Sequence, residues 1–279
     1  MTDIERYNTQ IQREVEYGNS QPGILNKDHF DSQGNIIPGD GIECEICKNR
    51  GYLYVIKFDD KGRAQRFYMS CECVPRRMAV RRIRESGLGN ALKRYTFESF
   101  TTDQDWQKRM KDTAMRYLRD GVRDGAWMYV GGMSGCGKSH LCTATAGVIL
   151  RKLDLRYVVW PRFAPKAKSF VTDDAEYERE VDPLRTVRVL YVDDMFKPTF
   201  GSVSSSNGVS AADVRLAFDI LNARYIDRLP TIISSEWYLS ELGKIDQAVA
   251  GRIIEMTGQF RMDIKRIPER NMRVNSAEI

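Results

Sequence analysis

The stretch that decides the fold is YVGGMSGCGKSHL, residues 129–141. Within it, residues 132–139 match the pattern G-x-x-x-x-G-K-[ST] throughout. The apolar run AWMYVGG (126–132) predicts a strand before the match, and KSHLCTATAGVILRKL (138–153) predicts a helix after it. In such a turn the backbone N–H groups point inward at phosphates, and the helix N-terminus adds positive potential. The context therefore favours a triphosphate-binding loop over a glycine-rich turn that holds no ligand.

Each residue type in this loop has a chemical reason to be there. The glycines let the backbone curl, Lys138 supplies a charge that reaches the outer phosphates, and Ser139 offers a hydroxyl to Mg²⁺. The predicted nucleotide contacts are Gly132, Gly135, Cys136, Gly137, Lys138, Ser139 and His140. The side chains of Cys136 and Cys142 are interpreted as small packing groups. ATP and Mg²⁺ are the expected cofactors.

A second, acidic element follows the apolar strand in VLYVDDMF, residues 189–196. Both carboxylates are expected at the carboxyl edge of the sheet, near the loop, with Asp193 in the magnesium shell and Asp194 as the base that orients water. The next strand, TIISSE (231–236), ends in Ser234 and Ser235, whose hydroxyls are suited to sensing the terminal phosphate. Ser235 is the assigned sensor, while Glu236 remains an alternative that would use a carboxylate.

From about residue 91 the chain alternates between helical patterns and short buried strands, which predicts an α/β domain over 91–279 with a parallel sheet covered on both sides. Helices are expected over 105–121 and 211–229, and strands over 156–160, 187–194 and 230–236. The segment GSVSSSNGVS (201–210) is of low complexity and predicts a flexible loop.

Four of the six cysteines form two close pairs, Cys44 with Cys47 and Cys71 with Cys73. Between the pairs, YLYVIKF and RFYMS predict two strands joined across DDKG, and such a hairpin would bring both pairs to one point. This favours a structural site of four thiolates for Zn²⁺ over free thiols or two disulfides. His29 is a competing ligand that is more simply interpreted as solvated.

Two helices flank the predicted zinc module: the first belongs to an N-terminal helix and linker over 1–40, and the second, basic helix is counted with the module in a domain of residues 41–86. Within residues 1–40, TDIERYNTQIQREVEYG predicts a helix with one apolar face, which comprises Ile4, Tyr7, Ile11 and Val15. This face either docks on a partner protein or packs on the zinc module itself. After the cysteines, PRRMAVRRIRESG predicts a helix that carries many arginines. This helix either follows a nucleic-acid backbone or is only a solvated face. Its arginines are Arg76, Arg77, Arg81, Arg82 and Arg84.

Composition sets broader bounds. The 279 residues carry 43 Lys and Arg against 38 Asp and Glu, so the formal net charge is only +5 and hints weakly at nucleic acid. The apolar runs are strand-sized, far below the roughly 20 residues of a membrane span. With no cationic and apolar leader at its start, the chain is expected to be cytoplasmic and without a membrane partner.

The core resembles the AAA+ ATPases of the DnaC/DnaI helicase-loader and IstB transposition-helper clade. The resemblance covers about residues 91–274 and is carried by YTFESF (95–100), GGMSGCGKSHL (131–141), VLYVDDM (189–195), LNARYIDRLPTIISSE (221–236) and GRIIEM (251–256). The cysteine pairs ahead of the core are similar to those of DnaI-type loaders. The resemblance implies that Arg252 is an arginine finger reaching a neighbouring subunit's nucleotide, and that Arg273 touches nucleotide within its own subunit.

Three features depart from the clade's pattern. Asp194 stands where many AAA+ proteins have Glu, which predicts slow hydrolysis, and Glu236 stands where this clade commonly has Asn. The chain after the core is expected to be too short for a full helical lid, as in the loaders.

The resemblance implies a function for the whole chain. We expect an ATPase that forms an ATP-dependent oligomer, binds a hexameric replicative helicase through its N-terminal region and delivers it to single-stranded DNA, in a bacterium or encoded by a phage. Two alternatives remain. One is an IstB-type ATPase that helps a transposase select its target, and the other is a zinc-bearing nucleic-acid adaptor whose nucleotide site is only structural.

Overall fold

The computed structural model describes residues 3–30, 32–34, 36–197 and 209–272, and these divide into two compact units, 1–81 and 82–279. Most of the loop predicted at 201–210 lies outside the described residues. Among those that are described, no helix is long and apolar enough to cross a membrane.

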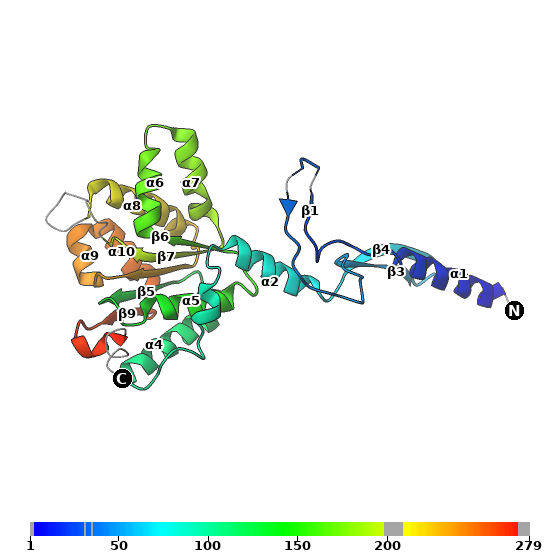
Figure 1. The fold of residues 1–279 in the computed structure, drawn as a ribbon, viewed down its shortest axis with the longest axis horizontal. Coiled ribbons are helices and arrows are strands. Elements are labelled where there is room, and N and C mark those ends of the chain that lie inside the picture. Colours follow the sequence, from blue (N-terminus) through cyan, green and yellow to red (C-terminus); the bar gives the residue numbers. More distant parts are fainter. Residues whose placement is uncertain (1–2, 31, 35, 198–208, 273–279) are drawn as a thin grey trace. The chain divides into compact units, whose positions relative to one another are not determined.

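The first unit is built on an antiparallel hairpin of β3 (Tyr52–Phe58) and β4 (Ala64–Ser70), with the predicted turn between the strands. A second, short pair is formed by β1 (His29–Phe30) and β2 (Ile36–Ile37). The N-terminal helix α1 (Asp3–Gly18) contacts β3 (Figure 1).

Helix α1 packs on its own hairpin, which is the second of the two uses that the sequence left open. Glu14 accepts hydrogen bonds from Tyr54 Oη at 2.5 Å and from Arg66 Nε at 2.6 Å. The helix ends where Gly18 lies against the Tyr54 ring, so closely that a Cβ at this position would clash with the ring.

The arginine-rich helix α2 spans Val74–Glu85. Two of its arginines are engaged within the protein: Arg77 is buried beside the cysteines, and Arg82 forms an ion pair with Asp154 at 2.9 Å. Arg76 is exposed. The helix is therefore not simply a solvated basic face.

The second unit contains a parallel five-stranded sheet in the order β6-β7-β8-β5-β9. Its strands are β5 (Trp127–Gly132), β6 (Leu155–Val159), β7 (Val189–Met195), β8 (Thr231–Ser235) and β9 (Arg261–Ile264). The parallel α/β architecture that the sequence predicts is confirmed.

Helices cover both faces of this sheet (Figure 1). One face carries α4 (Asp105–Arg116), the π-turn at Tyr117–Gly121 and α5 (Lys138–Ile149). The other carries α6 (Trp160–Ser169), α7 (Asp174–Thr186), α8 (Ala211–Ile226), α9 (Leu239–Ile245) and α10 (Gln247–Thr257). The short elements α3 (Ala91–Arg94) and the 3₁₀ turn Pro268–Arg270 complete the unit.

Two hydrophobic cores result from the alternation of side chains along the strands. In β5, Trp127 and Tyr129 enter the core beneath α6 to α10, whereas Met128 and Val130 enter the core beneath α4 and α5. Because the central strands are buried on both faces, their sequences read as continuous apolar runs. Their polar residues are left for the carboxyl ends, where the site lies.

Candidate nucleotide-binding site

The loop between β5 and α5 has the conformation that its glycines permit. Gly132, Gly135 and Gly137 have φ values of 134°, 81° and 86°, in the region that residues with a Cβ rarely adopt. Space is restricted as well, because a Cβ on Gly132 would collide with the carbonyl oxygen of Ile264. The loop therefore requires glycine at these three positions, and it ends at the first residues of α5.

Lys138 lies within this loop and is almost fully buried. Its Nζ donates hydrogen bonds to the carbonyl oxygens of Gly132 and Met133, both at 2.8 Å. An ammonium has three N–H groups, so two of them hold the loop closed on the lysine. The charge is thereby fixed at the mouth of the turn, where the helix N-terminus also favours an anion.

Asp193 is the polar centre at the end of β7 and is only 7% exposed. Its Oδ1 accepts hydrogen bonds from Ser139 Oγ at 2.9 Å and from Ser234 Oγ, and its Oδ2 accepts one from Tyr157 Oη at 3.1 Å. Burial and the nearby Asp193 carboxylate raise the pKa of Tyr157 well above its usual value, so the phenol stays a donor. The carboxylate is thus oriented toward Ser139 by two further hydroxyls.

The Ser139–Asp193 pair fits a magnesium ion by its chemistry. Carboxylate and hydroxyl oxygens are ligands that Mg²⁺ prefers, usually alongside phosphate oxygens and water. The two side chains come from the start of α5 and the end of β7, which the parallel sheet brings together. These are the two residues that the sequence assigns to the metal.

The two serines at the end of β8 have different environments. Ser234 Oγ donates to Asp193 and accepts a hydrogen bond from the backbone N–H of Asp194 at 3.0 Å. Ser235, the sensor assigned from sequence, is fully buried and donates to the carbonyl oxygen of Met195 at 2.7 Å. The geometry therefore brings Ser234, rather than Ser235, into contact with the acidic centre.

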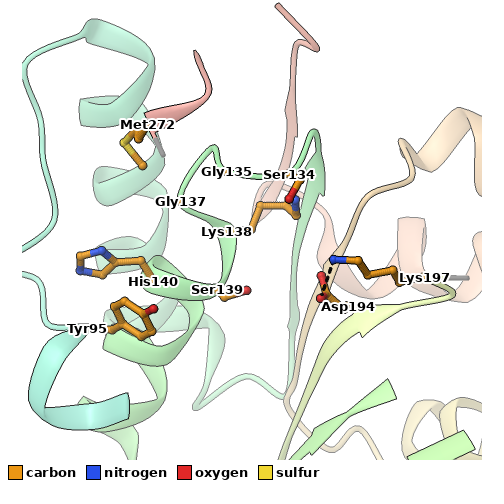
Figure 2. Close-up of a pocket in the computed structure, with 10 residues that line it drawn as sticks. All are labelled: Tyr95, Ser134, Gly135, Gly137, Lys138, Ser139, His140, Asp194, Lys197 and Met272. Carbon is orange, nitrogen blue, oxygen red and sulfur yellow. Dashed lines mark hydrogen bonds and ion pairs between the residues drawn. The ribbon is translucent and has the colours of Figure 1, made fainter. Parts of the chain in front are cut away.

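A pocket of about 320 Å³ opens over this arrangement (Figure 2). It is lined by Tyr95, Ser134, Gly135, Gly137, Lys138, Ser139, His140, Asp194, Lys197 and Met272. Figure 2 shows Asp194 and Lys197 facing the loop from the opposite wall. Gly132, Cys136 and Asp193 are not among the lining residues, and the Cys136 side chain packs in the core as interpreted from sequence.

His140 is held by the YTFESF segment. Its Nε2 lies 3.0 Å from the carbonyl oxygen of Thr96 and 3.1 Å from Ser99 Oγ, and the centre of its ring lies 5.0 Å from that of Tyr95 and 5.2 Å from that of Phe100. Burial lowers the pKa of His140, so it is neutral at pH 7. The segment before the core thus forms one wall of the pocket.

Arg252 does not line this pocket. It lies on α10, where its Nε donates to Asn222 Oδ1 at 2.9 Å and its guanidinium carbon lies 4.5 Å from the centre of the Phe218 ring. A place outside the chain's own pocket is compatible with a role toward a neighbouring subunit, and that role stays a prediction. Arg273 lies outside the described residues.

The four paired cysteines converge in the first unit. Their sulfur atoms all lie within 4.8 Å of one another, with Cys44 Sγ 3.8 Å from Cys71 Sγ and Cys47 Sγ 3.6 Å from Cys73 Sγ. A disulfide would place two sulfurs about 2.05 Å apart, whereas a tetrahedral metal with bonds of about 2.3 Å places them about 3.8 Å apart. The cluster could hold a metal ion, and its spacing does not fit two disulfides.

Arg77, on α2, forms hydrogen bonds to this cluster and to the residues around it. Its Nε donates to Cys73 Sγ at 3.2 Å, its Nη1 pairs with both carboxylate oxygens of Asp40 at 2.6 Å, and its Nη2 donates to the carbonyl of Ile42 and to Asn49 Oδ1, both at 2.9 Å. Sulfur ligands of metals commonly receive such hydrogen bonds from surrounding groups.

Sequence reasoning missed Tyr157 and Lys197. Tyr157 belongs to a strand that was predicted from its apolar residues alone. Nothing in that sequence indicates that the Tyr157 hydroxyl contacts Asp193. Lys197 follows the acidic pair by three residues, but its partners depend on a turn that the sequence does not reveal.

Comparisons with known proteins agree with this geometry. No protein-family model matches the chain. It is 29% identical over 202 residues to the uncharacterized protein YqaM of Bacillus subtilis (strain 168), covering 70% of this chain and 63% of that protein, so it spans less than two thirds of that relative's length. It is 26% identical over 229 residues to the phage-like element PBSX protein XkdC of the same strain, covering 80% of this chain and 82% of XkdC.

Among solved structures, a DnaC helicase loader superposes with a TM-score of 0.52 and 20% identity, covering 63% of this chain and all of that chain. DnaI superposes with a TM-score of 0.50 and 18% identity, covering 66% of this chain and 94% of that chain. At these identities the likeness concerns the fold. The second unit of this chain therefore shares the parallel α/β fold of these two chains.

Proposed function

We propose that this protein is an ATP-dependent loader of a hexameric replicative helicase, which it delivers to single-stranded DNA. The observation that carries the nucleotide part is the hydrogen bond between Ser139 and the buried Asp193, with Ser139 and Lys138 both lining one pocket. A phosphate-binding turn, a magnesium-binding pair and a further carboxylate, that of Asp194, are the parts that nucleotide hydrolysis requires.

Each residue of this site has its own proposed role in ATP binding or hydrolysis. Lys138 and the backbone of the loop bind the outer phosphates, and Ser139 with Asp193 would hold Mg²⁺, which supplies charge neutralisation when bound. Asp194 orients the attacking water, and Arg252 of a neighbouring subunit stabilises charge on the leaving phosphate. In this scheme ATP binding controls assembly and the grip on the client.

The client is proposed from similarity. The superposing structures include a DnaC helicase loader and DnaI, and one relative belongs to a phage-like element. The first unit has its own internal packing, so it is the proposed helicase-binding part, with its four cysteines holding Zn²⁺ as a structural ion.

The test is light scattering after size-exclusion chromatography of this protein mixed with the replicative helicase of its host, with and without Mg–ATP. We expect a complex whose mass changes with ATP. Lys138→Ala should abolish the change with ATP, and removal of residues 1–81 should abolish the complex. Arg188→Ala, which changes an exposed arginine of the second unit, is the matched control and should behave as the wild type.

Two outcomes would contradict the proposal. Absence of a complex under every nucleotide condition would remove the helicase as client. A stable complex with a transposase on duplex DNA, formed without residues 1–81, would replace the loader by the target-selection ATPase.

A further inference from the structure

Three charged side chains meet on the wall of the pocket opposite the phosphate loop. Lys197 Nζ lies 3.1 Å from Asp194 Oδ2 and 3.0 Å from Glu236 Oε1. Lys197 and Asp194 line the pocket together with Lys138 and Ser139, and Figure 2 shows the lysine extending over Asp194. Two cations therefore face the same space from opposite sides.

The backbone at the end of β7 and directly after it is shaped to hold Lys197 in this place. The ladder between β7 and β8 is irregular from Val192 to Met195, and Asp194 and Phe196 have φ values of 55° and 60°. Non-glycine residues adopt such values only where the surroundings enforce them, and they cluster at functional sites. Here the Lys197 N–H donates to the Asp194 carbonyl at 3.0 Å, and Trp237 Nε1 donates to the Phe196 carbonyl at 3.1 Å.

The charges at this wall explain why a cation is needed there. Asp194 lines the pocket in which the outer phosphates of a nucleotide would lie, Glu236 pairs with the same ammonium, and like charges at short range disfavour one another. Burial opposes the charge of Lys197, but the hydrogen bonds and ion pairs with Glu236 and Asp194 prevail and raise its pKa. The ammonium is therefore present at neutral pH and offsets one of the two carboxylates.

We propose that Lys197 is a phosphate-binding residue that contacts the terminal phosphate of the bound nucleotide and so distinguishes a triphosphate from a diphosphate. The Ser139–Asp193 pair marks the metal end of the site, and Lys197 lies beyond it on the side of Asp194. This inference rests on the proposed ATPase function and adds the residue by which the site recognises its substrate.

The test measures binding of Mg–ATP and Mg–ADP by isothermal titration calorimetry. A charge-assisted hydrogen bond contributes enough for about a tenfold change in affinity, so Lys197→Met should weaken ATP binding by about tenfold while ADP binding changes by less than about twofold. Lys197→Arg should preserve the preference for ATP. Lys152→Met, at an exposed lysine outside the pocket, is the matched control and should bind both nucleotides like the wild type.

A double variant separates a phosphate contact from a structural role. Lys197→Met with Glu236→Gln removes the uncompensated carboxylate, so ATP affinity should recover in part but stay below that of the wild type. The inference is overturned if Lys197→Met binds ATP normally, or if it loses ATP and ADP affinity equally. A wild type that binds ATP but no helicase contradicts the loader function alone, whereas a wild type that binds no nucleotide contradicts both.

Discussion

At the scale of single residues, Arg224 is a buried charged side chain that joins several segments of the core. It is fully buried, and its guanidinium donates to five acceptors at 2.8–3.3 Å; these are Thr231 Oγ1 and the carbonyl oxygens of Leu184, Arg185, Val187 and Pro230. Burial lowers its pKa to about 9, which reflects the cost of the buried charge. The hydrogen bonds offset that cost and satisfy carbonyls at the amino-terminal edge of the sheet.

Arg224→Met should therefore destabilise the core strongly. Each buried acceptor that loses its partner costs about 1–3 kcal/mol, so we expect a loss of at least about 3 kcal/mol in the free energy of unfolding. Urea unfolding followed by tryptophan fluorescence measures this, because Trp106, Trp127, Trp160 and Trp237 all lie in the second unit. Arg156→Met, at an exposed strand position, is the control. A loss equal to that of the control would show that the carbonyls find other partners.

The placement of site residues could be predicted from sequence where a motif fixes both residue type and spacing. The positions of Lys138, Ser139 and Asp193 follow from one loop and one strand end, and the structure brings them together. The distinction between Ser234 and Ser235 could not be read, because both face polar groups and only the register of β7 with β8 decides which one meets Asp193.

At the scale of elements, the hairpin β3–β4 and the two cysteine pairs form one structural unit, because the hairpin holds the pairs close together. The strands pair from Tyr52 with Ser70 to Phe58 with Ala64, which fixes Cys71 next to the loop that carries Cys44 and Cys47. A small sheet of two strands is marginally stable without further support. A metal ion joining the ends of the hairpin would supply that support.

We expect one zinc ion per chain in the purified protein, measured by elemental mass spectrometry. A strong chelator or Cys71→Ser should remove the ion and raise hydrogen exchange in β3 and β4, because the two ends of the hairpin are then no longer joined. Cys142→Ala changes a cysteine outside the cluster and should keep the ion. A protein that contains no metal but retains slow exchange in the hairpin would contradict the zinc site.

Element type was predictable wherever the apolar period was strong and the segment was bounded by turn residues. Strand β3 has the predicted bounds, and the strand around the acidic pair and the helix at 211 were identified with shifted ends. Helices α6 and α7 were not predicted, since Pro165 and Pro183 lie within them and proline disfavours helix interiors. Strand β9 is short and alternates in RMDI, a pattern too brief to recognise.

At the scale of the whole molecule, the position of Arg252 bears on assembly. The guanidinium carbon lies 4.5 Å from the centre of the Phe218 ring and 5.4 Å from that of the Tyr225 ring, both on α8. Its place on α10, outside the lining of this pocket, is compatible with action on the nucleotide of another copy of the chain, and that role stays a prediction. Such an arginine contributes on the order of a thousandfold in rate in related reactions.

Mixing two inactive variants tests this arrangement. Arg252→Ala and Asp194→Asn should each hydrolyse ATP at a small fraction of the wild-type rate, because one lacks the finger and the other lacks the base. In a random mixture each site has roughly one chance in four of combining an intact Asp194 with a neighbour's intact Arg252, so ATPase activity should return to roughly a quarter of the wild-type rate. Activity is measured with single-stranded DNA and helicase present, and a mixture of Asp194→Asn with Arg188→Ala controls for dilution. A mixture no more active than its separate components would show that Arg252 does not act between subunits.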